Sequence, residues 1–146
     1  MSKILILNGP NLNMLGTREP EIYGYTNLQD IEISCKVLAE ELQVETTFEQ
    51  SNYEGEIVSL IQKAENQYDG IIINAGGYSH NSIAIRDALA FFSGKIIEVH
   101  ITNIYGREEF RHNSMLSSIS DGIIVGLGAY SYVLAIRALV ELFRTS

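Results

Sequence analysis

Residues 70–74 read Gly70-Ile-Ile-Ile-Asn74, a short apolar run bounded by a glycine and an asparagine. Neighbouring side chains of a strand point to opposite faces, so three consecutive isoleucines make both faces apolar. Burial on both faces is typical of a central strand in a parallel sheet that helices cover on each side. The run therefore predicts such a strand, and the rest of the chain is interpreted around it.

Strand-like runs and segments of helical spacing alternate on either side of this run. The other expected strands are residues 3–8, 44–48, 95–101 and 122–125, and the expected helices are 28–42, 54–66, 81–92 and 130–144. In the first helix, apolar side chains recur at helical spacing from Leu28 to Leu42. This alternation predicts an α/β fold, a doubly wound five-stranded parallel sheet with helices on both faces. The simplest strand order is the flavodoxin-like order 2-1-3-4-5.

Length and composition limit the possible partners. The chain has 146 residues, of which 46% are hydrophobic, which suits a single domain spanning residues 1–146. A formal net charge of −8 disfavours nucleic acid, because phosphate backbones are bound by clustered Lys and Arg. The apolar runs are too short to span a bilayer, and no secretion signal is evident. The single cysteine, Cys35, excludes an internal disulfide and a multi-thiolate metal site, so a cytoplasmic protein is expected.

Polar or glycine-rich residues follow every expected strand. They are Asn8-Gly-Pro-Asn11, Gln50-Ser-Asn52, Asn74-Ala-Gly-Gly77, His100-Ile-Thr-Asn103 and Gly126-Leu-Gly128. Doubly wound sheets bind ligands beyond the carboxyl ends of their strands, where the strand order reverses. Converging amides and hydroxyls thus indicate a pocket for a small polyhydroxylated ligand, although Asn and Gly are also ordinary turn residues.

The connection from Gly9 to Tyr25 is long for a link between a strand and a helix. It carries Arg18 and Tyr23 between flanking glycines, which is the composition of a lid that closes over a site. The same pattern fits a surface loop whose tyrosine packs on the core and whose arginine pairs with Glu19 or Glu21. The loop composition favours neither interpretation.

Several long motifs follow one another along the chain. They are Asn8-Gly-Pro-Asn-Leu-Asn-Met-Leu-Gly16, Arg18-Glu-Pro20, Tyr23-Gly24, Gln50-Ser-Asn52, Glu54-Gly55, Asn74-Ala-Gly-Gly-Tyr-Ser-His80, Arg86-Asp87, Glu98-Val-His-Ile-Thr-Asn103, Arg107-Glu-Glu-Phe-Arg111 and Gly126-Leu-Gly128. In this order, and over essentially the whole chain, they resemble the signature of the type II 3-dehydroquinate dehydratases. The resemblance implies a hydro-lyase that converts 3-dehydroquinate to 3-dehydroshikimate through an enolate. It further implies a place in the shikimate pathway of aromatic amino acid biosynthesis, with no metal or organic cofactor.

The resemblance also implies roles for the reacting groups. Tyr23 corresponds to the base that removes a proton beside the substrate ketone, and Arg18 to the lid arginine that keeps this tyrosine reactive. A nearby guanidinium favours the phenolate form of a tyrosine, which agrees with that role. Asn11 matches the residue that helps to stabilise the enolate, and His100 matches the acid that protonates the departing hydroxyl.

Substrate-binding residues are implied in the same way. Those that bind the hydroxyls or organise the site are Asn74, His80, Asp87 and Arg111, and the carboxylate is held by the backbone amides of Ile101 and Thr102 with the Thr102 hydroxyl. Thr102 departs mildly from the serine that is common in the family. The family assembles as trimers grouped into dodecamers in which neighbouring subunits help to complete each site, so a homododecamer is implied.

Glu98 lies two residues before His100, on the same face of the expected strand, where it would orient or charge the imidazole. Without the motifs, His100 would be a strand-end residue bonded to backbone. Asp87 would pair with Arg86, and Arg111 with Glu108 or Glu109.

The other histidines suggest simpler roles. His80 lies between Ser79 and Asn81, which are natural N-caps for the following helix. His112 has no assigned role and is expected at the surface. Three separated histidines and one cysteine disfavour a zinc site.

A flavodoxin-like module that binds a nucleotide or flavin without this activity is the main alternative. The stretch Gly126-Leu-Gly-Ala-Tyr-Ser131 partly matches a dinucleotide fingerprint, but it follows the last strand and lacks the third glycine. A receiver domain would need an acidic cluster where Asn8 and Asn11 stand. A non-catalytic relative would be expected to lose the residues of the implied mechanism, which this sequence retains.

Overall fold

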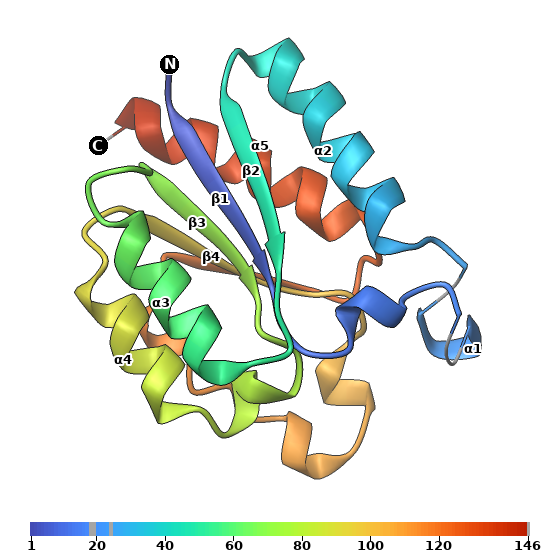
Figure 1. Ribbon diagram of the computed structural model, residues 1–146. Helices are drawn as coiled ribbons and strands as arrows, with labels where there is room; N and C mark the ends of the chain where they lie inside the picture. Colours follow the sequence, from blue (N-terminus) through green and yellow to red (C-terminus); the bar gives the residue numbers. More distant parts are fainter. Residues whose placement is uncertain (18–19, 24, 146) are drawn as a thin grey trace.

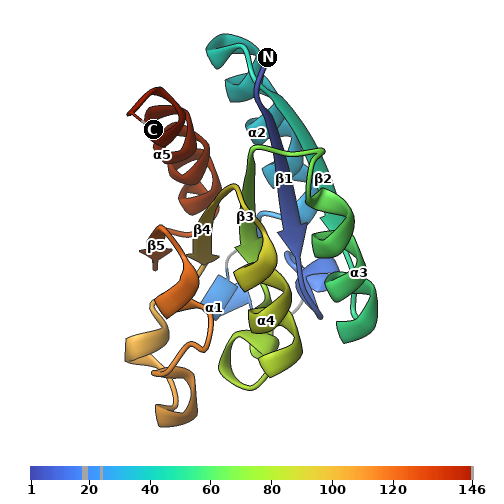
Figure 2. The ribbon, with the colours of Figure 1, turned by 90° about the vertical axis from the view of Figure 1, so that its left-hand side faces the viewer.

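A computed structural model describes residues 1–17, 20–23 and 25–145, with the side chains of Pro20 and Tyr23 outside the description. Its parallel sheet has the order β2-β1-β3-β4-β5, and the strand arrows run in one direction (Figures 1 and 2). The strands are β1 (Lys3–Asn8), β2 (Glu45–Gln50), β3 (Gly70–Asn74), β4 (Lys95–His100) and β5 (Gly122–Val125). The predicted flavodoxin-like sheet is confirmed.

Helices cover both faces of the sheet, as Figure 2 shows. One face carries α2 (Leu28–Leu42) and α5 (Tyr130–Thr145), and the other carries α3 (Glu54–Ala64) and α4 (Ile83–Phe91). The shorter helices are α1 (Pro20–Tyr23), η1 (Leu12–Met14), η2 (Gly76–His80), η3 (Ile104–Gly106), η4 (Glu109–Arg111) and η5 (Ser117–Ile119). No described helix has the length and apolar character needed to cross a bilayer.

The central strand β3 divides its side chains between two cores. Ile72 packs beneath α2 and α5, whereas Ile71 and Ile73 pack beneath α3 and α4. All three isoleucines are fully buried, and each buried side chain contributes on the order of 1.5–3 kcal/mol. The apolar run that predicted a doubly covered strand therefore does form the middle of the sheet.

The ends of α2 follow from local hydrogen bonds. At its start the Asn27 side chain accepts from the Asp30 amide at 2.8 Å, and the Asp30 side chain accepts from the Asn27 amide at 3.1 Å. This reciprocal capping satisfies two backbone donors that the helix leaves unpaired. Its last turn closes on Gln43 in the left-handed conformation, with φ of 57°. Within the helix Cys35 is a buried free thiol, and burial raises its pKa to about 12.

Several element boundaries differ from those expected. Strand β2 runs to Gln50 instead of residue 48, because it pairs with β1 along its whole length up to Asn8. Helix α4 begins at Ile83, and its cap is Ser82, whose hydroxyl accepts from the Ile85 amide at 3.0 Å. The expectation that Ser79 or Asn81 caps this helix is wrong, since Ser79 lies inside η2 and Asn81 ends it.

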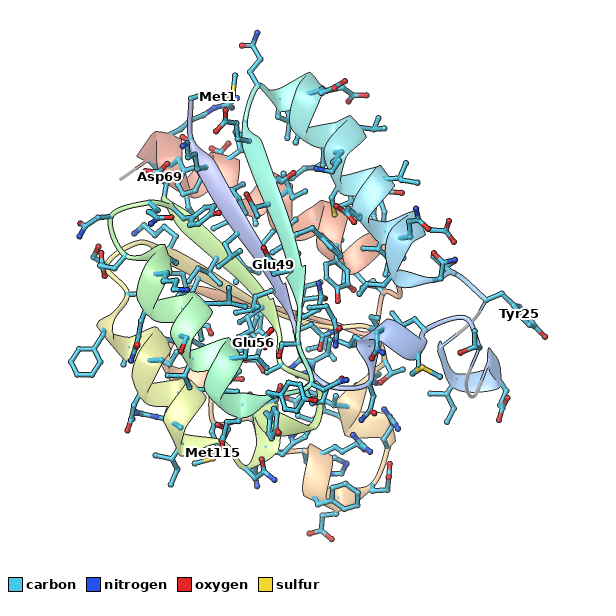
Figure 3. The ribbon with its side chains drawn as sticks, in the orientation of Figure 1. Met1, Tyr25, Glu49, Glu56, Asp69 and Met115 are labelled. Carbon is cyan, nitrogen blue, oxygen red and sulfur yellow. The ribbon has the colours of Figure 1, made fainter. Side chains whose placement is uncertain are left out.

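The connections beyond the carboxyl ends of the strands gather at one edge of the sheet. In Figure 3, Met1 and Asp69 lie toward the opposite edge, whereas Met115 lies in the group of loops at the carboxyl edge. The Met115 amide donates to the Ser79 carbonyl at 2.8 Å, which ties the segment after β4 to the segment after β3. The fold thereby brings the polar strand ends together.

Candidate active site

A cavity of about 170 Å³ lies over the carboxyl ends of β1, β3 and β4. Its lining residues are Pro10, Asn11, Leu12, Met14, Leu15, Asn74, Gly76, Gly77, His80, His100, Ile101, Thr102, Ile104, Arg107 and Arg111. The cavity lies at the point between β1 and β3 where the strand order reverses, as expected for this fold. It combines an apolar wall from η1 with amide, imidazole and guanidinium groups from the later strand ends.

A buried pair of hydrogen-bonded side chains, Glu98 and His100, lies at the end of β4. Glu98 is fully buried, and its Oε2 accepts hydrogen bonds from Nε2 of His100 and from the Ser114 hydroxyl, the latter at 2.5 Å. Its Oε1 accepts from the Ser117 hydroxyl at 2.6 Å. Burial alone would raise the pKa of Glu98, but the hydrogen bonds from His100, Ser114 and Ser117 outweigh it and lower the pKa. Glu98 is therefore an ionised carboxylate that fixes the His100 ring.

The other ring nitrogen of His100 is available to a ligand. Nδ1 has no hydrogen-bond partner among the described residues, and the His100 side chain lines the cavity. The ring of His80 stacks on it with centroids 6.3 Å apart, and Nδ1 of His80 contacts the Asn113 carbonyl at 2.9 Å. The predicted histidines are thus brought together on one wall.

Asn74 ends β3 with its side chain almost fully buried and bordering the cavity. Its Nδ2 donates to the Tyr132 hydroxyl at 3.0 Å, and its Oδ1 accepts from the Gly76 amide at 3.2 Å. Both ends of the amide are therefore held by the protein.

The loop after β1 places Asn11 at the cavity. Asn11 adopts the left-handed conformation, with φ of 72°, and its amide donates to Oδ1 of Asn52 at 3.0 Å. Gly9 passes so close to the loop after β3 that a Cβ there would lie 2.4 Å from the Ala75 carbonyl oxygen. Close approach between these loops thus requires a glycine at position 9.

Two arginines make the remaining wall cationic. Arg111 donates from Nε to Glu108 at 3.1 Å, so the ion pair anticipated from the sequence forms while Arg111 also lines the cavity. Nη1 of Arg107 donates to the Thr102 hydroxyl at 3.3 Å. Arg107 was not expected at the site, although it opens the motif that ends at Arg111. Ile101 and Thr102 follow β4 and line the cavity as expected.

Asp87 is not brought into this cavity. It lies on α4 with its side chain 56% exposed and pairs with Arg86 at 3.2 Å. Arg18 and the Tyr23 side chain fall outside the described residues. His112, which was expected at the surface, is partly exposed, and its Nε2 contacts the Arg107 carbonyl at 3.1 Å. The described part of the chain holds no cluster of three His, Cys, Asp or Glu side chains that suits a metal ion.

Comparison with known proteins gives consistent matches. The family model described as "Dehydroquinase class II" matches residues 2–140. The chain is 55% identical over 142 residues to a 3-dehydroquinate dehydratase of Endomicrobium trichonymphae, covering 97% of this chain and 99% of that protein. It is 51% identical over 141 residues to one of Bacillus subtilis (strain 168), covering 97% and 95%. The crystal structure of a type II dehydroquinase from Butyrivibrio crossotus DSM 2876 matches with a TM-score of 0.93 and 48% identity, covering 94% of this chain and 97% of that one.

A flavodoxin-like sheet with a polar cavity over its carboxyl edge defines an α/β protein built to bind a small molecule. The chain belongs to the class II dehydroquinase family. It is a hydro-lyase, as the sequence predicted. The alternative of a flavin- or nucleotide-binding module without this activity is not supported by these matches.

Proposed function

We propose that this protein, working as a single catalytic domain, dehydrates 3-dehydroquinate to 3-dehydroshikimate in the shikimate pathway. The observation that carries the proposal is the His100–Glu98 pair, which faces a cavity lined by amides and guanidinium groups in a chain of this family. An acid supported by a buried carboxylate is what the departure of a hydroxyl group requires.

The reaction begins with Tyr23 as the base. Its phenolate removes a proton from the carbon beside the ketone, and the electrons of that C–H bond form an enolate that Asn11 helps to stabilise. Arg18 provides the positive charge that keeps the tyrosine in its reactive form. No metal or organic cofactor takes part in this step.

The second step expels water. The enolate collapses to form the carbon–carbon double bond while the bond to the neighbouring hydroxyl breaks, and His100 gives its proton to that hydroxyl. Because Nε2 of His100 is bound to Glu98, the proton leaves from Nδ1, the ring nitrogen that remains for a ligand on a side chain that lines the cavity. The proton gained by Tyr23 and the proton lost by His100 balance, so the products are the enone and one water molecule.

Binding uses the groups on the cavity wall. Asn74, His80 and Arg111 bind hydroxyl groups of the substrate. The backbone amides of Ile101 and Thr102, with the Thr102 hydroxyl, hold the carboxylate. Arg107, which already donates to that hydroxyl, adds a positive charge beside the carboxylate.

The protein is further proposed to work as a homododecamer built of trimers. Asp87 lies outside the cavity of its own chain, which suits a residue that completes the site of a neighbouring subunit. Such sharing makes the assembly a requirement for full activity.

The test adds 3-dehydroquinate to the purified protein and follows the conjugated enone by ultraviolet absorbance. We expect turnover that persists in a chelator and after borohydride treatment, and that Tyr23→Phe and His100→Ala each nearly abolish. The matched control is Tyr25→Phe, because Tyr25 is 81% exposed and projects from the molecule (Figure 3). Absence of enone formation by the wild type would refute the function, and full activity of Tyr23→Phe would refute the assigned base.

A further inference from the structure

A chain of buried polar side chains runs beneath the cavity. It joins Asn8 at the end of β1, Tyr132 in the first turn of α5 and Asn74 at the end of β3. Asn8 and Tyr132 are completely buried, and Asn74 is 4% exposed. Burying polar groups in a sheet core costs free energy unless the groups are hydrogen-bonded. A fully bonded buried network also holds its side chains in one arrangement.

The direction of every hydrogen bond in this chain is set from its far end. Nδ2 of Asn8 donates to the Glu49 carbonyl at 3.2 Å, which leaves Oδ1 of Asn8 pointing at Tyr132. The Tyr132 hydroxyl donates its only proton to that oxygen at 2.6 Å. Its own oxygen can then only accept, and it does so from Nδ2 of Asn74 at 3.0 Å.

The consequence reaches the cavity through Asn74. With Nδ2 directed at Tyr132 and Oδ1 directed at the Gly76 amide, the side-chain amide of Asn74 is fixed in one of its two orientations. One N–H and one lone pair of Asn74 remain for a ligand, at defined positions on the cavity wall. If the Asn74 amide were flipped, Nδ2 and Oδ1 would exchange places, and a ligand would meet a donor in place of the acceptor and an acceptor in place of the donor.

We propose that Tyr132 is a positioning residue, which together with Asn8 fixes the amide of Asn74 for recognition of a substrate hydroxyl. This inference rests on the proposed function, in which Asn74 binds 3-dehydroquinate. The residue acts through Asn74, because Tyr132 does not line the cavity.

Burial supports this role by keeping the tyrosine neutral. Burial raises the pKa of Tyr132 well above its usual value, so its hydroxyl remains a proton donor over the whole pH range in which the enzyme is used. The rival explanation is that Tyr132 only fills the core, where its ring lies 6.3 Å from that of Phe48. The Tyr132→Phe variant distinguishes the positioning role from the core-filling role, since it keeps the ring and removes the hydroxyl.

The first test is steady-state kinetics with 3-dehydroquinate. We expect Tyr132→Phe to raise KM about tenfold with kcat changed by less than about threefold, because loss of an acceptor frees Asn74 to turn and weakens binding of substrate and transition state alike. Asn8→Ala should raise KM in the same direction, because the Tyr132 hydroxyl then turns to donate toward Asn74. The control is Tyr68→Phe, at the other end of the sheet, which should leave both constants unchanged.

A double-mutant cycle tests whether the effect passes through Asn74. Asn74→Ala alone should raise KM, and adding Tyr132→Phe should produce no further rise. Multiplied effects in the double variant, or an unchanged KM in Tyr132→Phe, would overturn the inference.

A measurement without substrate separates this inference from the proposed function. In nuclear magnetic resonance spectra the Asn74 side-chain amide signals should shift in Tyr132→Phe and not in Tyr68→Phe. A wild type that fails to turn over 3-dehydroquinate while these signals shift refutes the function and leaves the positioning role intact. Unshifted signals refute the positioning role.

Discussion

At the scale of single residues, Glu98 and His100 lie two positions apart on one face of β4, where their side chains form a hydrogen bond. Their spacing of two residues predicts contact, and the structure confirms it in a setting that the spacing does not reveal. The carboxylate is fully buried and bound by two serine hydroxyls from a segment 16 to 19 residues later. A charge kept in the interior in this way is available to stabilise an imidazolium beside it.

Glu98→Gln is expected to lower kcat by about ten- to a hundredfold with little change in KM. The amide keeps the shape of the side chain but removes the charge that supports His100 as an acid. Steady-state kinetics against Glu49→Gln, an exposed glutamate on β2, provides the comparison. An unaltered kcat would show that Glu98 has only a packing role.

At the scale of elements, the sequence predicted the strand bounds best where an apolar run is flanked by polar or glycine residues. Strands β1, β3 and β5 have the expected bounds, because apolar runs between polar residues define where pairing starts and stops. The start of α4 was not predictable, since Ser79, Asn81 and Ser82 all suit a cap. The choice falls on Ser82, whose hydroxyl also donates to Glu54 of α3 at 2.5 Å, a tertiary contact that no local pattern contains.

The site shows the same division. His100, Asn74 and Arg111 lie at the ends of predicted strands or in the quoted motifs, and the structure places all three at the cavity. Arg107 and Tyr132 were not predicted from the sequence. The position of Arg107 depends on the path of the segment after β4, and the contacts of Tyr132 depend on how α5 packs over the ends of β1 and β3.

The segment between β4 and β5 stabilises the fold through Glu98, and this contribution depends on pH. Because the pKa of Glu98 is lower in the folded state, its stabilisation is present above its ordinary pKa and is lost as the pH falls through the folded value. Ser117→Ala removes a donor and brings that pKa back up, so acid destabilisation should begin at a higher pH. Urea unfolding from pH 7 downward measures this, with Ser118→Ala, an exposed neighbour, as the control. Superimposable pH profiles of the two variants would contradict the prediction.

At the scale of the whole molecule, the proposed dodecamer predicts that each active site needs residues from two chains. The described cavity is lined by imidazole, amide and guanidinium groups, while Asp87 lies outside it on α4. If neighbouring subunits share sites, two chains that are defective in different ways can complement each other.

Co-expressed His100→Ala and Asp87→Ala chains should therefore form mixed oligomers that regain activity. In a random equal mixture about a quarter of the sites combine an intact His100 with an intact Asp87 from the neighbour. A mixture of His100→Ala and Tyr23→Phe chains should regain none, because the proposed mechanism uses both residues from the same chain in one site. Activity assays on the purified mixtures check this, and equal recovery in both mixtures, or recovery in neither, would contradict the shared site.

The hydrogen bonds that hold the Asn8 side chain also affect how fast this residue deamidates. An asparagine followed by glycine is prone to deamidation, in which the glycine nitrogen attacks the side-chain carbonyl and a succinimide forms. Here the Gly9 nitrogen is engaged with the Asn74 carbonyl at 2.7 Å, and both ends of the Asn8 side chain are held by Tyr132 and Glu49. The native fold thus protects the Asn8–Gly9 linkage from deamidation. Molecules that spend time unfolded are expected to accumulate deamidated Asn8 first.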